Sequence, residues 1–208
     1  MDNQLNKIKL SYKDIEKQIK KYKLRFPYIK NTKVEKYIKF PIFVDSFYEL
    51  LFFSKKVPTQ KEFIENYIKR HKEKECIKCL NNNEKKALRA RLCRTYPSYI
   101  RDLHFSKMLE EKLDFGEVIY NSEIDVKDGV DTLIKYNNTK YAVCLYINTQ
   151  RSQNFRKTKI KQQKNGYIYI ELPLNMKESK EVGDFYLYTK DNLINLLNFI
   201  LKFEQEAV

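Results

Sequence analysis

No stretch of this chain approaches the ~20 consecutive apolar residues that a helix needs to cross a lipid bilayer. This absence excludes a membrane-spanning protein. The first residues, Met-Asp-Asn-Gln, also lack the charged and then apolar order of a signal peptide, so we expect a cytoplasmic location. Hydrophobic residues make up 42% of the 208 residues, which is enough to bury the core of one sizeable domain or of two small ones.

Cysteine is scarce, and the four that are present fit a reducing compartment. Cys76 and Cys79 form a C-x-x-C motif, and His71 and Cys93 lie near enough in sequence to complete a tetrahedral zinc site. Structural zinc sites usually show two paired half-sites, and the second pair is missing. We therefore expect reduced thiols at Cys76 and Cys79 and no zinc.

Negative charge is missing between Asp131 and Glu171. The bases of this acid-free segment are Lys135, Lys140, Arg151, Arg156, Lys157, Lys159, Lys161 and Lys164. The acids just before it are Glu110, Glu111, Asp114, Glu117, Glu123, Asp125, Asp128 and Asp131. Carboxylates beside a cationic segment can hold a divalent cation and a phosphate side by side. The alternative is a solvated surface with an uneven charge pattern.

The net charge of +14 belongs entirely to the first half of the chain. Residues 1–100 carry 25 Lys and Arg against 11 Asp and Glu, whereas residues 101–208 carry 16 of each. A basic region attracts polyanions, so nucleic acid is the first partner to expect.

Capping signals predict several helices in this basic half. Ser11 begins a helix over residues 11–24, and capping boxes start further helices at Ser46 and Thr59. A third helix begins near Asn83, which completes the outline of a helix-turn-helix. The bases of that third helix, which suit contacts to phosphates or guanine edges, are Lys85, Lys86, Arg89, Arg91 and Arg94.

The pattern changes after Tyr96-Pro97-Ser98, where Ser98 is predicted to cap a new helix. Short β-branched and aromatic runs then predict strands at 116–120, 131–136, 141–147, 167–172 and 185–188, with a hairpin turn at Asn137-Asn138. A basic crossover helix is expected over 148–164 and an amphipathic helix over 191–205. The expected fold is α+β or α/β, with a basic helical region at 1–97 and a mixed-sheet domain at 98–208.

The order helix, strand, strand, strand, helix, strand resembles the core of the restriction-endonuclease-like, or PD-(D/E)XK, superfamily. In that family an acid begins the second core strand, an acid-x-lysine lies in the third, and a glutamate on the leading helix helps to hold magnesium. Asp131 matches the first acid, and Glu111 or Glu110 matches the helix glutamate. The third strand, residues 141–147, contains neither acid nor lysine.

The resemblance implies a magnesium site made by Glu111 and Asp131. It also implies that neighbouring elements replace the missing groups, with Glu171 as the acid and Lys157 or Arg151 as the base. The bases of the crossover helix, Arg151, Arg156, Lys157, Lys161 and Lys164, would then face the phosphate backbone.

We therefore expect a DNA-binding protein of a mobile element or defence system that acts on duplex DNA, with a nuclease-like domain that cleaves with magnesium. Two alternatives stay open. One is a binding or assembly module whose degenerate site takes no metal. The other is a protein-interaction subunit, homodimeric or heteromeric, whose basic half meets an acidic partner.

Overall fold

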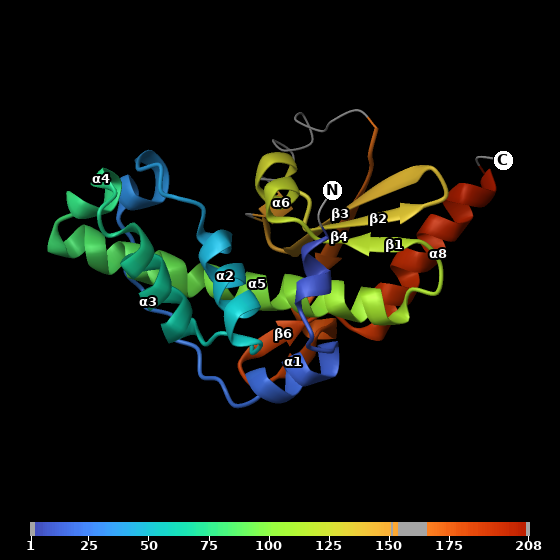
Figure 1. The fold of residues 1–208 in the computed structure, drawn as a ribbon, viewed down its shortest axis with the longest axis horizontal. Coiled ribbons are helices and arrows are strands. Elements are labelled where there is room, and N and C mark those ends of the chain that lie inside the picture. Colours follow the sequence, from blue (N-terminus) through green and yellow to red (C-terminus); the bar gives the residue numbers. More distant parts are fainter. Residues whose placement is uncertain (1–2, 151, 154–165, 207–208) are drawn as a thin grey trace.

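A computed structural model describes residues 3–150, 152–153 and 166–206 (Figure 1). In this part of the chain a helical region precedes a four-stranded mixed sheet with flanking helices, so the predicted α+β class is confirmed. Figure 1 shows the long helix α5, Asn82–Lys112, running beneath the sheet and alongside the N-terminal helices.

The N-terminal half is built from helices and short helical turns. Their bounds are η1 Gln4–Lys7, α1 Tyr12–Ile19, η2 Lys33–Tyr37, α2 Phe43–Ser54, α3 Gln60–His71, α4 Glu75–Lys78 and α5 Asn82–Lys112. Reciprocal capping boxes begin α1, α3 and α5, because a side chain at each N-cap accepts from a backbone N–H that would otherwise lack a partner. Their pairs are Ser11 with Asp14, Thr59 with Glu62, and Asn81 with Glu84. The starts predicted from the signals at Ser11 and Thr59 are confirmed, whereas the capping box at Asn81 was not predicted.

Helix α1 is shorter than the predicted helix over 11–24. It ends at Ile19, and the residues that follow bond to distant segments instead of continuing the helix. The Tyr22 hydroxyl donates to the carbonyl of Val57 at 2.6 Å, and the N–H of Leu24 donates to the carboxylate of Asp184 at 2.9 Å. Tertiary contacts therefore set the end of this helix.

Helix α2 begins at Phe43, which makes the predicted start at Ser46 wrong. Its N-cap, Ile42, supplies no side-chain hydrogen bond, and Ser46 is buried within the helix. Phe47 is fully buried, with its ring centroid 6.3 Å from that of Phe63. Burial of apolar side chains, and not a cap, fixes where α2 starts.

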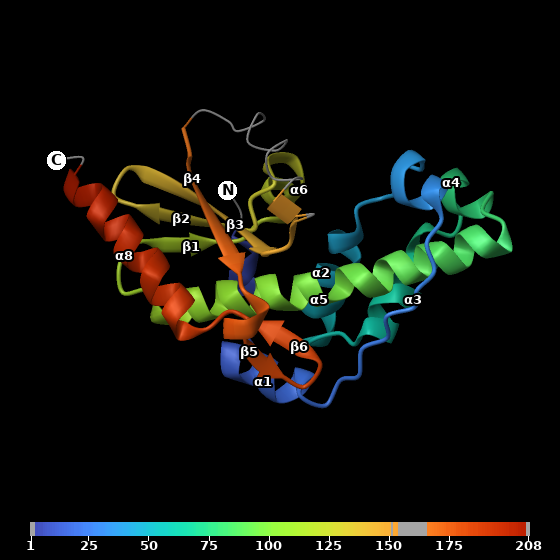
Figure 2. The same cartoon turned by 180° about the vertical axis from the view of Figure 1, so that it is seen from behind.

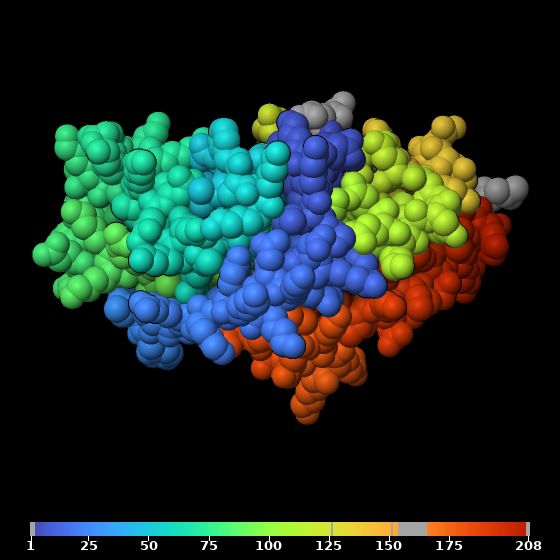
Figure 3. Space-filling view, turned by 60° about the horizontal axis from the view of Figure 1, so that its bottom comes forward, coloured from blue at the N-terminus to red at the C-terminus, as the bar shows by residue number. Residues whose placement is uncertain are grey.

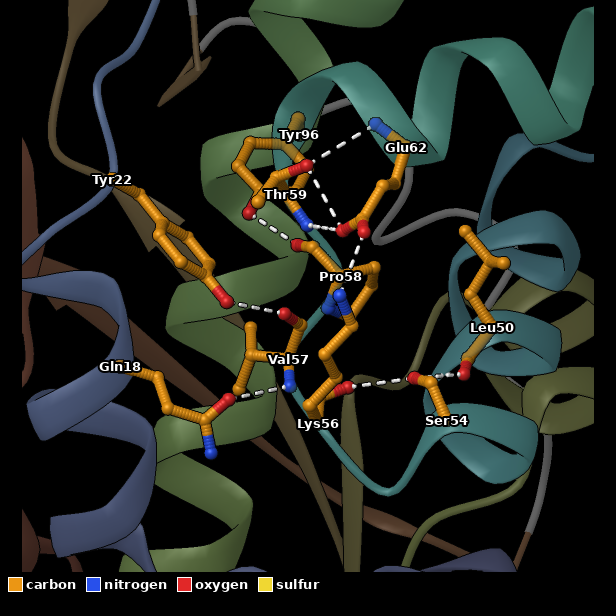
Figure 4. A network of polar contacts seen from close by, with 10 residues as sticks. All are labelled: Gln18, Tyr22, Leu50, Ser54, Lys56, Val57, Pro58, Thr59, Glu62 and Tyr96. Carbon is orange, nitrogen blue, oxygen red and sulfur yellow. Dashed lines mark hydrogen bonds and ion pairs between the residues drawn. The ribbon is translucent and has the colours of Figure 1, made fainter.

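The turn between α2 and α3 is bound on both sides by other helices (Figure 4). Gln18 of α1 accepts from the N–H of Val57 at 2.9 Å, and Tyr22 donates to the carbonyl of the same residue. From α5, the Tyr96 hydroxyl donates to the carbonyl of Pro58 at 2.6 Å. These bonds fix the α2–α3 hairpin against α1 and α5.

Helix α5 is continuous over 31 residues, about 46 Å, and passes through Pro97. The predicted new helix start at Ser98 is therefore wrong. Proline has no N–H, so the carbonyl of Cys93 loses its donor within the helix. Gln60 of α3 supplies the replacement, because its Nε2 donates to the Cys93 carbonyl at 3.0 Å. A side chain from another helix thus offsets the interruption.

The helical region and the sheet share one hydrophobic core. Buried members of that core include Leu5, Phe47, Leu92, Ile100, Ile134, Val143 and Leu196. The division predicted between residues 97 and 98 falls inside α5, and neither the helix nor the core is interrupted there.

The four-stranded sheet has the order β1-β2-β3-β4. Its strands are β1 Glu117–Ile119, β2 Thr132–Tyr136, β3 Thr139–Ile147 and β4 Ile168–Leu174. The pairs β1–β2 and β2–β3 are antiparallel, whereas β3–β4 is parallel. Asn137 has a positive φ of 50°, as the predicted turn at Asn137-Asn138 requires. The described residues also contain a helix that we did not predict, α6 at Ser122–Asp128.

A second, two-stranded sheet and a C-terminal helix complete the described fold. The elements are η4 Met176–Glu178, β5 Lys180–Val182, β6 Phe185–Leu187 and α8 Lys190–Glu206. Figure 2 shows β5, β6 and α1 on the side of α5 opposite to the four-stranded sheet. Helix α8 lies beside the β2–β3 hairpin, where Asn137 donates to Glu204 at 2.7 Å.

Different helices pack on the two faces of the four-stranded sheet. On one face lies α5, whose Ser106 shares a 2.5 Å hydrogen bond with Thr132 of β2. On the other face a smaller apolar cluster joins the sheet to α6, with Ile124 of α6 beside Leu133 and Ala142. The residues just before β2 therefore lie where α5, α6 and the sheet meet.

Candidate nucleic-acid interface

The acids of the basic half are largely engaged in contacts within the protein. Those in capping boxes are Asp14, Glu62 and Glu84, and those in ion pairs with bases are Glu16, Glu35, Glu49, Glu65 and Glu73. Many bases of the same half remain exposed. Those that lie on α1, directly after it and along residues 25–39, which we call the basic track, are Lys13, Lys17, Lys20, Lys21, Arg25, Lys30, Lys36 and Lys39.

No member of the basic track forms an ion pair with a described residue. A row of solvated cations on a fixed backbone attracts a polyanion, because each contact with a phosphate releases condensed counterions. Figure 3 shows that α1 and the segment after it, both blue, run along one face of the molecule.

A cavity of about 620 Å³ lies between α1 and the β5–β6 sheet. Its basic lining residues are Lys13, Lys17, Lys20, Lys180 and Lys190. The acids at the same cavity are Glu16 and Glu181. Because Glu16 is already paired, the cavity presents a surplus of positive charge that suits an anionic group.

Glu16 joins three elements that are distant in sequence. The buried imidazole of His104 on α5 donates to its carboxylate at 2.8 Å, and Lys180 of β5 donates to it at 2.6 Å. These two donors, with His104 the larger contributor, lower the pKa of Glu16 to about 2. Glu16 therefore stays ionised at neutral pH and holds α1 against α5 and β5.

The bases predicted on the third helix separate into two groups. Lys85, Lys86 and Arg89 are exposed on α5 and form no ion pair with a described residue. Arg91 and Arg94 are half-buried and bind other parts of the protein, and their predicted contact with nucleic acid stays a prediction. Helical geometry explains the difference, because residues two and five positions beyond Arg89 lie on another side of the helix.

Arg91 and Arg94 hold the segment that precedes α2. Arg91 donates to the carbonyl of Val34 at 2.5 Å, and its guanidinium carbon lies 5.3 Å from the ring centroid of Phe43. Arg94 donates to the carbonyl of Ile29 at 3.0 Å and to the carboxylate of Glu35. These two arginines therefore hold the segment before α2 against α5.

The basic crossover helix predicted over 148–164 lies mostly outside the described residues. The bases concerned are Arg151, Arg156, Lys157, Lys161 and Lys164. Their predicted contacts with the phosphate backbone, and the catalytic role predicted for Lys157, stay predictions.

Asp131 and Glu171 lie level with each other across the sheet. Asp131 directly precedes β2, and its carboxylate accepts from the N–H of Leu145 on β3 at 2.6 Å. The β2–β3 register, continued by one residue, sets Asp131 opposite Cys144, and Cys144 pairs with Glu171 on β4. Two strand spacings, about 9.5 Å, therefore separate the backbones of the two acids.

Glu111 binds the start of α1, and its predicted part in a magnesium site with Asp131 stays a prediction. Its carboxylate accepts from the N–H of Tyr12, the first residue of α1, at 2.7 Å. Ser106 is the α5 residue bonded to Thr132, beside Asp131, and Glu111 lies about 7.5 Å farther along the helix axis.

Asp102 is the acid of α5 that we did not identify from the sequence. It lies one turn before Ser106, whose hydroxyl donates to its carbonyl at 2.8 Å. Burial is the main reason that the pKa of Tyr188 is raised, and the negative charges of Asp102 and Asp131 raise it further. Both acids therefore lie near the same buried tyrosine. The sequence carries no signal for this placement, because it depends on the tertiary contact between Ser106 and Thr132.

The described residues contain no group of three Asp, Glu, His or Cys side chains placed to hold a metal ion. Asp131 and Glu171 carry oxygens of the kind that Mg²⁺ prefers, and the magnesium site predicted from the sequence stays a prediction. Cys76 is half-buried, Cys79 is exposed and Cys93 is buried.

No family model, curated protein or solved structure matches this chain. Among the described helices, none combines the length and apolar character that crossing a membrane requires. The resemblance to restriction-endonuclease-like proteins stays a prediction.

Proposed function

We propose that this protein binds nucleic acid through the basic track. The observation that carries the proposal is the division of roles among charged residues in the first hundred positions. Most described acids there cap helices or pair with bases, whereas the track of lysines and arginines stays exposed on one face. The exposed bases of α5, Lys85, Lys86 and Arg89, would add contacts at a second site.

The cavity beside α1 supports the same function. Lys13, Lys17 and Lys20 line it at helical spacing, so their ammonium groups lie on one side of α1. Lysines placed in this way bind phosphates as point charges and carry no base specificity. We therefore expect affinity that is nearly independent of sequence and falls steeply with salt.

Binding should be tested with the whole chain, because α5 and the core join its two halves. Fluorescence anisotropy would give the dissociation constant for labelled duplex and single-stranded DNA over a range of salt concentrations. The triple substitution Lys13→Gln, Lys17→Gln, Lys20→Gln should lower the slope of log K against log salt by about 2 to 3. The matched control is Lys69→Gln, Lys74→Gln, Lys78→Gln, which removes equal charge from exposed positions on α3, on α4 and between them.

Equal effects of the two triple variants would contradict the proposal, because binding would then depend on net charge and not on the track. If the wild type binds neither labelled DNA at low salt, the proposal fails and the alternative of an acidic protein partner is favoured.

A second candidate function is cleavage of the bound nucleic acid. The observation that favours it is the level placement of Asp131 and Glu171 across β2, β3 and β4, with Asp102 near the same tyrosine as Asp131. Asp131 and Glu171 would hold Mg²⁺, which would neutralise charge on the phosphate. Incubation of supercoiled plasmid with Mg²⁺, Mn²⁺ or a chelator tests this function. Nicking that depends on metal and disappears in Asp131→Asn would support it, and an intact plasmid under all conditions would contradict it.

A further inference from the structure

Three large aromatic side chains of the segment between α1 and α2 face solvent. Phe26, Tyr28 and Tyr37 are 60%, 92% and 74% exposed. Single exposed apolar residues are common on proteins. Three exposed aromatic rings within twelve residues of one segment form a cluster, and such clusters indicate a ligand-binding surface.

The backbone that carries these rings is held at both ends. Near its start, the N–H of Arg25 donates to Gln60 at 2.9 Å, and Gln60 donates back to the carbonyl of Arg25 at 3.1 Å. Near its end, Tyr67 donates to the carbonyl of Pro41 at 2.9 Å.

The same backbone is also held in the middle. Arg94 binds the carbonyl of Ile29, Arg91 binds that of Val34, and the Val34 side chain is fully buried. The rings therefore project from a backbone that folding has already ordered. A ligand that stacks on them does not have to order the segment.

Positive charge alternates with the exposed rings. Arg25, Lys30, Lys36 and Lys39 are exposed, and none forms an ion pair with a described residue. The acid of this segment is Glu35, and Arg94 pairs with it. The segment therefore presents flat π faces and phosphate-binding cations together.

We infer that residues 25–39 form a stacking platform for single-stranded nucleic acid. This inference rests on the proposed function and makes it narrower. Unpaired bases stack on exposed aromatic rings whatever their sequence, because every base has a π face. In a duplex the base faces already stack on one another, so the rings give no advantage there. Cations between the rings meet the phosphates of the same strand.

The test compares oligo(dT), oligo(U) and a duplex of equal length on the whole chain over the same range of salt concentrations. Tyr28→Ala should weaken binding of single strands by about 5-fold or more, and Tyr37→Ala should do the same. Neither should change duplex affinity or the salt slope, because no charge is removed. Tyr28→Phe keeps the ring and should bind as the wild type does.

Phe53→Ala is the matched control, since this ring is 82% exposed at the end of α2, outside the platform. It should leave all affinities unchanged. If Tyr28→Ala and Tyr37→Ala bind single strands as tightly as the wild type, the platform is refuted while binding along the basic track stands. If the wild type binds neither single strands nor duplex, the proposed function and the platform both fail. Oligo(dT) against oligo(U) shows whether the DNA or the RNA strand binds more tightly, and loss of binding to either through Tyr28→Ala supports the platform.

Discussion

Gln60 and Pro97 should be energetically coupled, although they lie on different helices. Gln60 is 6% exposed and makes three hydrogen bonds, two with the backbone of Arg25 and one with the carbonyl of Cys93. A buried hydrogen bond contributes about 1 kcal/mol net, so Gln60→Ala should lower the free energy of unfolding by about 2 to 4 kcal/mol.

Pro97→Ala restores the N–H that the helix lacks at this position, and that N–H can reach the carbonyl of Cys93. In the wild type this carbonyl is already bound by Gln60, so the new donor adds little. In the Gln60→Ala background the carbonyl would otherwise be buried without a donor, and the new N–H should recover about 1 to 2 kcal/mol. The two substitutions should therefore be non-additive by roughly that amount.

Urea denaturation of the wild type, both single variants and the double variant measures this coupling. Asn66→Ala is the control partner for Pro97→Ala, since Asn66 also lies on α3 but donates to the carbonyl of Ser46 and not to α5. The control pair should be additive. Additivity of Gln60→Ala and Pro97→Ala within about 0.5 kcal/mol would refute the explanation of why α5 continues through its proline.

Glu16→Gln should lower the free energy of unfolding by about 1 to 2 kcal/mol at pH 7. This value is smaller than the lowering of the Glu16 pKa to about 2 would give, because the partner Lys180 is partly solvated. Since folding lowers this pKa, the ionised Glu16 stabilises the protein above the unfolded pKa of 4.5, and the stabilisation is lost as the pH falls toward 2. If urea denaturation shows that Glu16→Gln loses the same free energy of unfolding at pH 7 and at pH 3, this explanation is contradicted. Gly116→Ala should cost well over 1 kcal/mol, because φ is +74° and the new Cβ would lie 2.4 Å from the carbonyl oxygen of Lys135. Gly166→Ala is its control, since φ is also positive there but nothing lies within 4 Å; equal losses of thermal stability would show that the contact with Lys135 has no cost.

Local signals in the sequence predicted the fold where the stabilising partner is also local. Ser11 and Thr59 cap their helices through residues three positions away, so the sequence shows both partners of each bond. The prediction failed where the partner is distant. Ser46 has a glutamate at the capping spacing, yet α2 starts earlier, where Phe43 packs on Tyr67 and Val44 is buried. Pro97 ends no helix, because its missing donor is replaced by Gln60.

The candidate sites could likewise be predicted where the contacts are local in sequence, and not where they are distant. The lysines of α1 could be predicted as a basic surface from helical spacing alone. In the sequence, Arg91 and Arg94 look like solvent-facing bases. Only their hydrogen bonds with the 27–35 segment show that they bind another part of the protein. That Asp131 and Glu171 lie level with each other follows only from the register of β2, β3 and β4, which the sequence does not show. The choice of Asp102 over Glu111 depended on which turn of α5 contacts β2 through Ser106 and Thr132, and the sequence did not indicate this contact.

The contacts of residues 3–24 impose an order on folding during synthesis. Asn3 donates to the carbonyl of Val118 at 2.8 Å, and the α1 segment is bound by His104 and by Asp184 through Leu24. A ribosome adds about 5 to 20 residues per second, so this segment waits for roughly ten to thirty seconds before its last partner is made. During that time its lysines stay solvated and its apolar residues, Leu5, Ile15 and Ile19, have no native cover. The segment that anchors the finished fold is therefore exposed to chaperones and proteases for longer than any other part of the core to which it belongs.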